Sequence, residues 1–435
     1  MLPSPIQCPQ TMNGAKDVTS PSFDGNSTAN NPLADSILSA YNAASYSEAD
    51  ADAMLIDQPQ RLADAVYEAI CKDIEEKPNT KGMTLFRDKV FENCSPKYIT
   101  LKNVRMGPNG VAALTRMMAT MSISSLDLAQ NNLGDEGVET LANYIVSRPI
   151  VRHLNLASNG IGLEGIESII TLLPFLKTLN LSNIPGFPVR NQINSNTCGA
   201  LIRALCTSPG LHSLNLANNG IGVASSTPVS SSAAATDNKA PITHTTLLEL
   251  IAVALSRYQT QLVHLVLDRN GLGTRGATTV LTALAQNKQL RYLSLADNDI
   301  TADISQTLDV VLRVNTSLCG LILKNNPIGP GITRFCQALS QNKHLTVLDL
   351  ENCGIDDAGA LALAQVLAVN RSITHLNLAG NAIGSKGGYA IATALKYNHV
   401  LDTLSLERNP LRPEVGVALA DALAINEVGG LFICI

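Results

Sequence analysis

Three histidines stand at equivalent positions of a repeated sequence and are the first candidates for metal chemistry. His153, His264 and His375 each lie two residues before the centre of a Leu-x-Leu stretch. If each stretch is a strand, these strands are three and four repeats apart, which separates the rings by roughly 14 and 19 Å. Zinc ligands must lie within about 2.3 Å of the metal. We therefore expect no metal site and no cofactor, and interpret the histidines as single polar contacts on an exposed face.

Motifs of enzymatic chemistry are missing from the sequence. It has no glycine-rich phosphate loop, no H-E-x-x-H, no G-x-S-x-G and no carboxylate pair at catalytic spacing. The pair Asp356-Asp357 resembles no metal loop and is most simply the solvated start of a helix. We therefore predict a protein that is not an enzyme.

The elements that would position any site come from a repeated Leu-x-Leu-x-x-Asn motif. Its first leucines stand at 126, 154, 179, 214, 265, 293, 321, 348, 376 and 404. A period of about 28 residues indicates a solenoid, whose units bury their core against their neighbours. Ile99-Thr-Leu101 lies 27 residues before the first motif and Leu431-Phe-Ile433 lies 27 after the last. The chain is therefore expected to have about twelve repeats, counting both irregular ends.

Within each repeat the apolar residues first recur at every second position and then with a period of 3.6 residues, which predicts a strand, a loop and a helix. The asparagine that ends the motif leaves the strand, so its amide can bond neighbouring backbone. We interpret these residues as a structural ladder: Asn131, Asn159, Asn219, Asn270, Asn298, Asn326, Asn381 and Asn409. A second series recurs just past each helix, at Asn287, Asn315, Asn342, Asn370, Asn398 and Asn426. Asparagine tolerates the left-handed conformation that ends many helices, and we expect that conformation there.

Composition restricts the class of protein further. Hydrophobic residues make up 45% of the chain and aromatic residues 4%, with no Trp, which fits a core of stacked aliphatic layers. The net charge is only -5 and has no basic stripe, which disfavours nucleic acid as a partner. No secretory leader and no run of 18 apolar residues is evident, and the nine cysteines form no C-x-x-C pair. We expect a cytoplasmic protein, with the nucleus as an alternative, that is neither secreted nor inserted in a membrane.

Three regions follow from these patterns. Residues 1–58 are rich in Ser, Asn, Asp and Pro and are expected to be a disordered tail. Residues 59–97 contain a helical pattern closed by Lys77-Pro78 and are expected to cap the first repeat. Residues 98–435 form the repeat domain, with insertions near 184–197 and 223–245. Each insertion fits either a binding flap or a tolerated surface loop.

A Leu-x-x-Leu-x-Leu-x-x-Asn strand followed by a full helix at 28-residue spacing resembles the ribonuclease-inhibitor type of leucine-rich repeat. The resemblance covers about three-quarters of the chain and implies an α/β horseshoe, with a parallel sheet on the concave side and helices on the convex side. Members include ribonuclease inhibitors, NOD-like receptor sensors, Ran GTPase-activating proteins, tropomodulins and ciliary subunits, which present a surface to another protein. The chain departs from them in lacking dense cysteines, a P-loop before the repeats and an acidic tail.

In such a sheet the leucines point to the core, and the residues between and beside them face the concave side. The central positions of the first repeats are polar, whereas later repeats carry apolar residues among charges. An apolar centre with a charged rim is typical of a protein interface, and Tyr and Arg are favoured anchors. The predicted partner site comprises Val266, Asp268, Arg269, Tyr292, Asp297, Ile322, Lys324, Val347 and Glu351.

The last apolar segment, Gly430-Leu-Phe-Ile-Cys-Ile435, adds a second hypothesis. A terminal edge strand invites pairing. A partner or a second copy covers it, the N-terminal tail folds over it, or it tolerates exposure; we favour a partner or a second copy. The sequence as a whole favours a non-enzymatic scaffold that binds an unidentified protein partner on its concave face. The alternatives left open are a GTPase-activating protein of the Ran type, and a sensor or regulatory subunit of a NOD-like receptor, cytoskeletal or ciliary assembly.

Overall fold

The computed structural model describes residues 58–193, 195–206, 210–222, 247–256, 261–426 and 431–435. The described residues all lie in one compact unit, Ala51–Ile435. The expected tail and the expected insertion at 223–245 lie outside the described residues. All of the described helices and strands belong to this unit.

Twelve short parallel strands form a single sheet in which the order in space is the order in sequence. They are β1 Tyr98–Thr100, β2 Ser125–Asp127, β3 His153–Asn155, β4 Thr178–Asn180, β5 Ser213–Asn215, β6 His264–Val266, β7 Tyr292–Ser294, β8 Gly320–Ile322, β9 Val347–Asp349, β10 His375–Asn377, β11 Thr403–Ser405 and β12 Phe432–Cys434. Each repeat takes the number of its strand. From β1 to β11 the middle residue of each strand is a buried Leu or Ile, and each such side chain contributes about 1.5–3 kcal/mol by leaving water.

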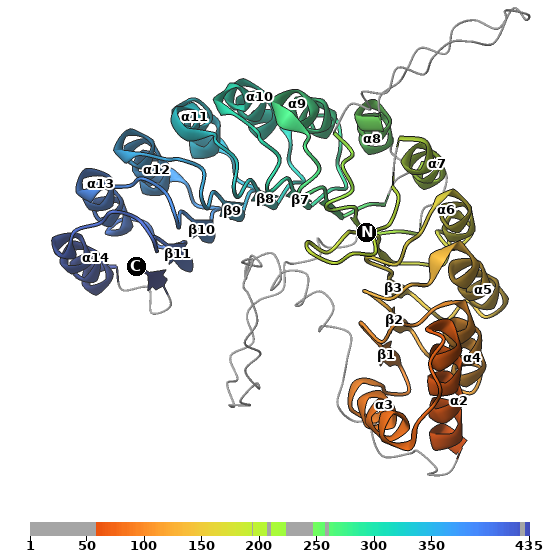
Figure 1. Cartoon of the computed structure of the whole chain (residues 1–435). Coiled ribbons are helices and arrows are strands. Elements are labelled where there is room, and N and C mark those ends of the chain that lie inside the picture. Colours follow the sequence, from red (N-terminus) through yellow and green to blue (C-terminus); the bar gives the residue numbers. More distant parts are fainter. Residues whose placement is uncertain (1–57, 194, 207–209, 223–246, 257–260, 427–430) are drawn as a thin grey trace, which may run out of the picture. The chain divides into compact units, whose positions relative to one another are not determined.

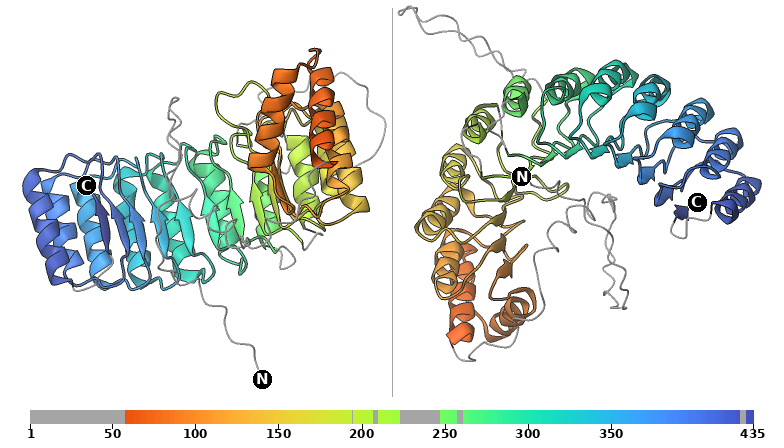
Figure 2. Two further views of the ribbon diagram at one scale, coloured as in Figure 1. Left: turned by 90° about the horizontal axis from the view of Figure 1, so that it is seen from below. Right: turned by 180° about the vertical axis from the view of Figure 1, so that it is seen from behind.

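One helix follows each strand from β1 to β11 and lies on the outer side of the curved sheet (Figure 1). These helices are α4 Pro108–Met118, α5 Gly134–Ser147, α6 Leu163–Ile170, α7 Ser195–Leu205, α8 Leu247–Ser256, α9 Gly273–Leu284, α10 Ser305–Val314, α11 Ile332–Gln341, α12 Asp357–Val369, α13 Ser385–Leu395 and α14 Pro413–Ile425. Short 3-10 turns, Ala302–Ile304 and Gly329–Gly331, precede α10 and α11. The result is the horseshoe solenoid that the repeat predicts, with the sheet concave and the helices convex (Figure 2). None of the described helices is long and apolar enough to cross a membrane.

Two further helices, α2 Gln58–Asp73 and α3 Thr80–Asn93, precede the first strand. Val66 and Ile70 of α2 are buried, and α2 packs against α4. The Asp73 carboxylate accepts hydrogen bonds from the backbone N–H groups of Gly107 and Gly110, both at 2.8 Å. It therefore satisfies the N-terminal N–H groups of α4. Asp357 does the same for α13 from the preceding repeat, so α2 occupies the place of a repeat helix.

The asparagines that follow the helices were expected in the left-handed conformation, and this expectation is wrong. Asn315, Asn342 and Asn370 end α10, α11 and α12 with φ between -77° and -67° and ψ near 130°. The chain continues extended toward the next strand, so no left-handed residue is needed. Their side chains link repeats instead: the Asn370 amide donates to the carbonyl oxygen of Leu339 at 2.8 Å, and its oxygen accepts from the N–H of Ile373.

The register of the last strand also differs from the sequence prediction. Ile433, not Leu431, pairs with Leu404, which places Phe432 beside Thr403 and Cys434 beside Ser405. The segment from Leu431 to Ile435 is apolar throughout apart from its cysteine. Without alternation between polar and apolar residues, two registers fit the pattern equally well.

Candidate functional site

The asparagine ladder forms the framework on which the concave side chains stand. Asn298, fully buried, donates from its amide to the carbonyl oxygens of Leu267 and Ala296, both at 3.0 Å. Its own oxygen accepts from the N–H groups of Asn270 at 2.9 Å and Leu272 at 3.3 Å. The side chain therefore ties its loop to the preceding repeat.

The same amide contact recurs at every predicted ladder position. In each case the amide donates to the carbonyl oxygen of the second leucine of the preceding repeat, at 2.8–3.2 Å: Asn131, Asn159, Asn219, Asn270, Asn298, Asn326, Asn381 and Asn409. The residue before most of these asparagines has a positive φ, as at Arg269 and Asp297. This left-handed residue turns the chain out of the strand and directs the asparagine into the core.

A ninth ladder asparagine, Asn191, was missed in the sequence. Its amide donates to the carbonyl oxygens of Leu156 and Leu181, and its oxygen accepts from the N–H groups of Asn159 and Ile161. The insertion of repeat 4 therefore begins before the ladder residue and displaces it along the sequence. The signal was present, because Asn191-Gln-Ile193 has the Asn-x-Ile spacing of Asn159-Gly-Ile161.

The part of that insertion that the structure describes folds back along the rim and is tied to its neighbours. The N–H of Ile184 donates to the Ser158 hydroxyl at 2.8 Å, and the Arg190 guanidinium donates to the carbonyl oxygen of Asn218 at 2.9 Å. Phe187 and Val189 line a cavity of about 270 Å³ together with Asp73 at the end of α2 and with residues that follow the first two strands. The segment is therefore anchored, which favours neither of the two interpretations made from sequence.

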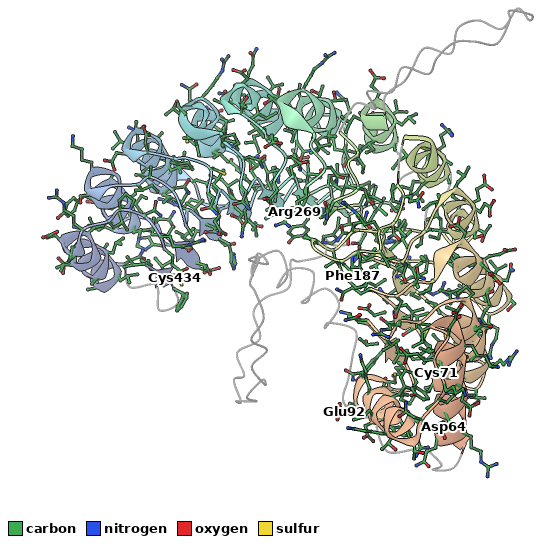
Figure 3. All side chains as sticks on the ribbon, in the orientation of Figure 1. Asp64, Cys71, Glu92, Phe187, Arg269 and Cys434 are labelled. Carbon is green, nitrogen blue, oxygen red and sulfur yellow. The ribbon has the colours of Figure 1, made fainter. Side chains whose placement is uncertain are left out.

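The register of the sheet arranges the nine predicted partner residues in rows on the concave face. Tyr292 and Val347 belong to the row that contains His264. Val266 and Ile322 belong to the adjacent row, separated by Ser294. The remaining residues follow the strands on one edge of the sheet: Asp268, Arg269, Asp297, Lys324 and Glu351. We call these nine residues the central concave segment; Arg269 lies on the inner side of the arc (Figure 3).

Two neighbouring rings lie stacked at the start of this segment. His264 and Tyr292 face each other with ring centroids 4.7 Å apart and planes 4° from parallel. Burial, followed by the nearby His212, lowers the pKa of His264 to about 4, so the imidazole is neutral at pH 7. The other two candidate histidines contact threonine hydroxyls. The Nδ1 atom of His153 lies 3.1 Å from the Thr178 hydroxyl, and that of His375 lies 2.8 Å from the Thr374 hydroxyl.

Acidic and basic groups line the edge of the segment nearest β6 and β7. The Asp268 carboxylate accepts from the Ser294 hydroxyl at 2.5 Å and from the N–H of Ala296 at 2.8 Å. Burial raises the pKa of Asp268 to about 6, although both hydrogen bonds act in the opposite direction. Arg269 and Asp297 form a half-exposed ion pair with nitrogen and oxygen 3.5 Å apart. This edge therefore offers charge of both signs.

A charged cluster occupies the other end of the segment. Lys324 Nζ lies 2.9 Å from the Glu351 carboxylate, which also accepts from Arg408 and from the Asn377 amide. Burial raises the pKa of Glu351, but the hydrogen bonds from Lys324 and Arg408 outweigh it and hold the pKa below its ordinary value. Arg408 was not predicted, because it reaches Glu351 from two repeats further along.

Four of the nine residues are much less exposed than the sequence suggested. Ile322 and Val347 are 6% exposed, and Lys324 and Glu351 are 4% exposed. Adjacent strands bring their side chains within about 4.8 Å, and the paired charges lie against the sheet. The accessible atoms of the central concave segment therefore come from the half-buried residues Val266, Asp268, Arg269, Tyr292 and Asp297.

Comparisons with known proteins agree with this geometry. The family model described as "Leucine Rich repeat" matches residues 121–142, 149–169, 286–304, 341–364 and 369–392. Pig (Sus scrofa) ribonuclease inhibitor is 26% identical over 296 residues, which cover 65% of this chain and 58% of that protein. The chain therefore contains leucine-rich repeats and is similar over much of its length to a ribonuclease inhibitor.

The chain is also similar to a second curated protein and to a solved structure. "Leucine-rich repeat-containing protein 45" of Gallus gallus is 36% identical over 97 residues, which cover 22% of this chain and 14% of that protein. The chain therefore spans only part of the curated relatives that it matches. A crystal structure of an internalin from Listeria monocytogenes aligns over 87% of this chain and 98% of its own, with 18% identity and a TM-score of 0.41. Leucine-rich repeat proteins of this type act as protein-interaction scaffolds.

Proposed function

We propose that this leucine-rich repeat protein is a non-enzymatic scaffold that binds a protein partner at the central concave segment. The observation that carries the proposal is the change of surface between β5 and β7. In the central row of the sheet, Asn180 and Asn215 are followed by Val266. Beside it stand the stacked rings of His264 and Tyr292.

The accessible residues of this segment have the composition of an interface centre. Val266 and Tyr292 supply apolar and aromatic surface, while Arg269 and Asp297 supply opposite charges at the edge. Such centres are enriched in Tyr and Arg and are surrounded by polar groups. The buried cluster of Lys324 and Glu351 would act as a rigid support under this surface.

The proposal also places the protein in the cytoplasm or nucleus. Nine cysteines, an odd number, are scattered through the sequence without C-x-x-C spacing. This distribution is typical of proteins in reducing compartments. No nucleic acid partner is proposed, because the net charge is only -5.

Affinity capture from cell extract with quantitative mass spectrometry tests the concave site. The test variant is Val266→Asp with Tyr292→Asp, which puts charge into the apolar part of the surface without altering the buried Ile322. The matched control is Arg275→Asp with Thr282→Asp on exposed positions of α9, which belongs to the same repeat as β6 but lies on the opposite face. Circular dichroism confirms that both variants fold.

We expect the proteins captured by the wild-type chain and by the α9 variant to be lost by the concave variant. A further variant, Arg269→Asp with Asp297→Arg, keeps an ion pair but reverses the charges that a partner would meet. Capture that is unchanged in both concave variants would contradict the proposal.

A further inference from the structure

The edge of the sheet at which the strands begin is basic from β3 to β7. The segments that join α5 to β3, α6 to β4, α7 to β5, α8 to β6 and α9 to β7 meet at this edge. Their described residues include no Asp or Glu, and their described basic residues are Arg148, Arg152, Lys177, Lys288 and Arg291. We call these five residues the basic edge. The whole chain has a net charge of -5, so packing the repeats separates charges that alternate in sign along the sequence.

The opposite edge of the same strands has charges of both signs. Asp268, Arg269 and Asp297 follow β6 and β7 there, and Arg269 is paired with Asp297. Within the described part of the chain, no ion pair includes a residue of the basic edge. The described carboxylates therefore do not neutralise the positive charges of the basic edge.

Backbone carbonyl oxygens position the arginines of the basic edge. The Arg152 guanidinium donates to the carbonyl oxygen of Phe175 at 2.8 Å, and that of Arg291 donates to the carbonyl oxygen of Ser317 at 3.4 Å. A guanidinium has five N–H donors and keeps its charge in such a bond. Each side chain is therefore oriented by the neighbouring repeat while most of its donors stay available to a ligand.

The fold does not require all of this charge. The helix dipole favours a basic residue near the last turn of a helix by about 0.3–1 kcal/mol, which accounts for Arg148 directly after α5. Arg152, Lys177 and Arg291 instead directly precede β3, β4 and β7. Val263 stands at the equivalent position before β6, so the solenoid accepts an uncharged side chain there.

The exposed side chains of Arg152, Lys177 and Arg291 belong to one hydrogen-bonded row. The backbone N–H of each residue in this row donates to the carbonyl oxygen of the one before it at 2.7–2.8 Å, in the order Arg152, Lys177, His212, Val263 and Arg291. Adjacent strands are about 4.8 Å apart, so the row is about 19 Å long. About six residues of an extended peptide have the same length.

We propose that the basic edge binds an extended acidic segment of a partner protein, at a surface separate from the central concave segment. Carboxylates at alternate positions of an extended peptide lie about 7 Å apart on one side of the chain. The long side chains of Lys177 and Lys288 reach across that spacing, and the arginines bind carboxylates through paired N–H groups. Complementary charge of this kind directs a partner to one orientation.

An acidic peptide fits this row better than a nucleic acid does. Proteins that bind single strands stack the bases on aromatic side chains, and the row of Arg152, Lys177, His212, Val263 and Arg291 has no Phe, Tyr or Trp. A duplex carries one charge per about 1.7 Å and extends far beyond the row. The rest of the chain, with its acidic excess, repels such a polyanion, whereas a short acidic segment contacts only the basic edge.

Fluorescence anisotropy with the full chain tests the proposal. The probe is a labelled octaglutamate peptide, with octaglutamine as the neutral reference and an oligothymidine of the same length as the nucleic acid reference. The test variant is Arg152→Glu with Lys177→Glu. The matched control, Arg275→Glu with Arg334→Glu, makes the same change of net charge at exposed positions in the first turns of α9 and α11.

A second variant, Lys177→Gln with Lys288→Gln, removes two charges from exposed lysines and leaves the bonds of the arginines in place. Circular dichroism checks the fold of each variant. We expect octaglutamate to bind the wild-type chain and the control variant within about twofold of each other, the glutamate variant at least about tenfold more weakly, and the glutamine variant at least about threefold more weakly. Raising the salt from about 0.1 M to about 1 M shortens the Debye length from about 10 Å to about 3 Å and should abolish binding.

Four outcomes would overturn the proposal. Octaglutamate that binds the wild-type chain no more tightly than octaglutamine shows that the edge does not recognise carboxylates. Binding that persists in both the glutamate and the glutamine variants, or that falls equally in the control variant, places the peptide elsewhere. Tighter binding of the oligothymidine than of octaglutamate would assign the basic edge to nucleic acid.

Discussion

Asn298 provides a quantitative test of the asparagine ladder. Replacing it by Ala removes two donated and two accepted hydrogen bonds from a side chain that is fully buried. The carbonyl oxygen of Leu267 and the N–H groups of Asn270 and Leu272 then lose a partner where water has no access. Each buried group left unpaired costs about 1–3 kcal/mol.

Because these losses are not additive, we expect Asn298→Ala to lower the free energy of unfolding by about 3–5 kcal/mol. That is a large part of the 5–15 kcal/mol typical of a folded domain. Since each repeat is stabilised by its neighbours, the loss should also separate the array into two unfolding units. Urea titration followed by far-UV circular dichroism measures both effects.

The control is Asn132→Ala, at an exposed asparagine in the loop of repeat 2. It should change the free energy of unfolding by less than about 0.5 kcal/mol. If Asn298→Ala costs less than about 1 kcal/mol, the bonds of the ladder do not carry the stability attributed to them.

Three more measurements concern single side chains. Cys353 holds a ladder position and donates to the carbonyl oxygen of Leu323, but its thiol accepts weakly. Cys353→Asn should add an acceptor facing the N–H of Asn326 and raise the urea midpoint by an amount equivalent to about 1 kcal/mol. The pKa of Asp268 is raised to about 6, so its folded state holds the proton more tightly. The stabilisation that this proton gives the folded state is complete below about pH 4 and is lost as the pH rises through about 6. Over that range the free energy of unfolding of the wild-type chain should fall by about 1–3 kcal/mol relative to that of Asp268→Asn. Parallel pH profiles of the two proteins would contradict this. Burial raises the pKa of Cys336 and of Cys353 to about 12, so both thiols should react with a thiol reagent at pH 8 only in denaturant, which mass spectrometry of the labelled peptides would show.

The asparagines show how far sequence reasoning reached in the framework of the site. Eight ladder positions were predicted because a fixed interval from the strand places them in the same local geometry. Asn191 was not predicted, because the insertion changes that interval while the loop still returns to the same place. For Asn315 and its equivalents the position was right but the conformation was wrong, since the amide serves the preceding repeat rather than a left-handed turn.

The candidate site was predicted only in outline. Strand alternation identified which side chains face the concave side, since the period of a strand is 2. It did not indicate how much of each side chain meets solvent. Lys324 and Glu351 are buried as an ion pair that also includes Arg408, which lies two repeats beyond Glu351.

The solenoid, the order of its strands and the layer of leucines beneath them are all specified by the repeated motif. A motif repeated at 28 residues has few ways to bury its apolar side chains, and stacking identical units satisfies them all. Other properties emerge only when the repeats are packed together: which polar groups meet across repeats, and which concave residues are accessible. These properties depend on neighbours contributed by other repeats, and a pattern along one strand or helix does not contain them.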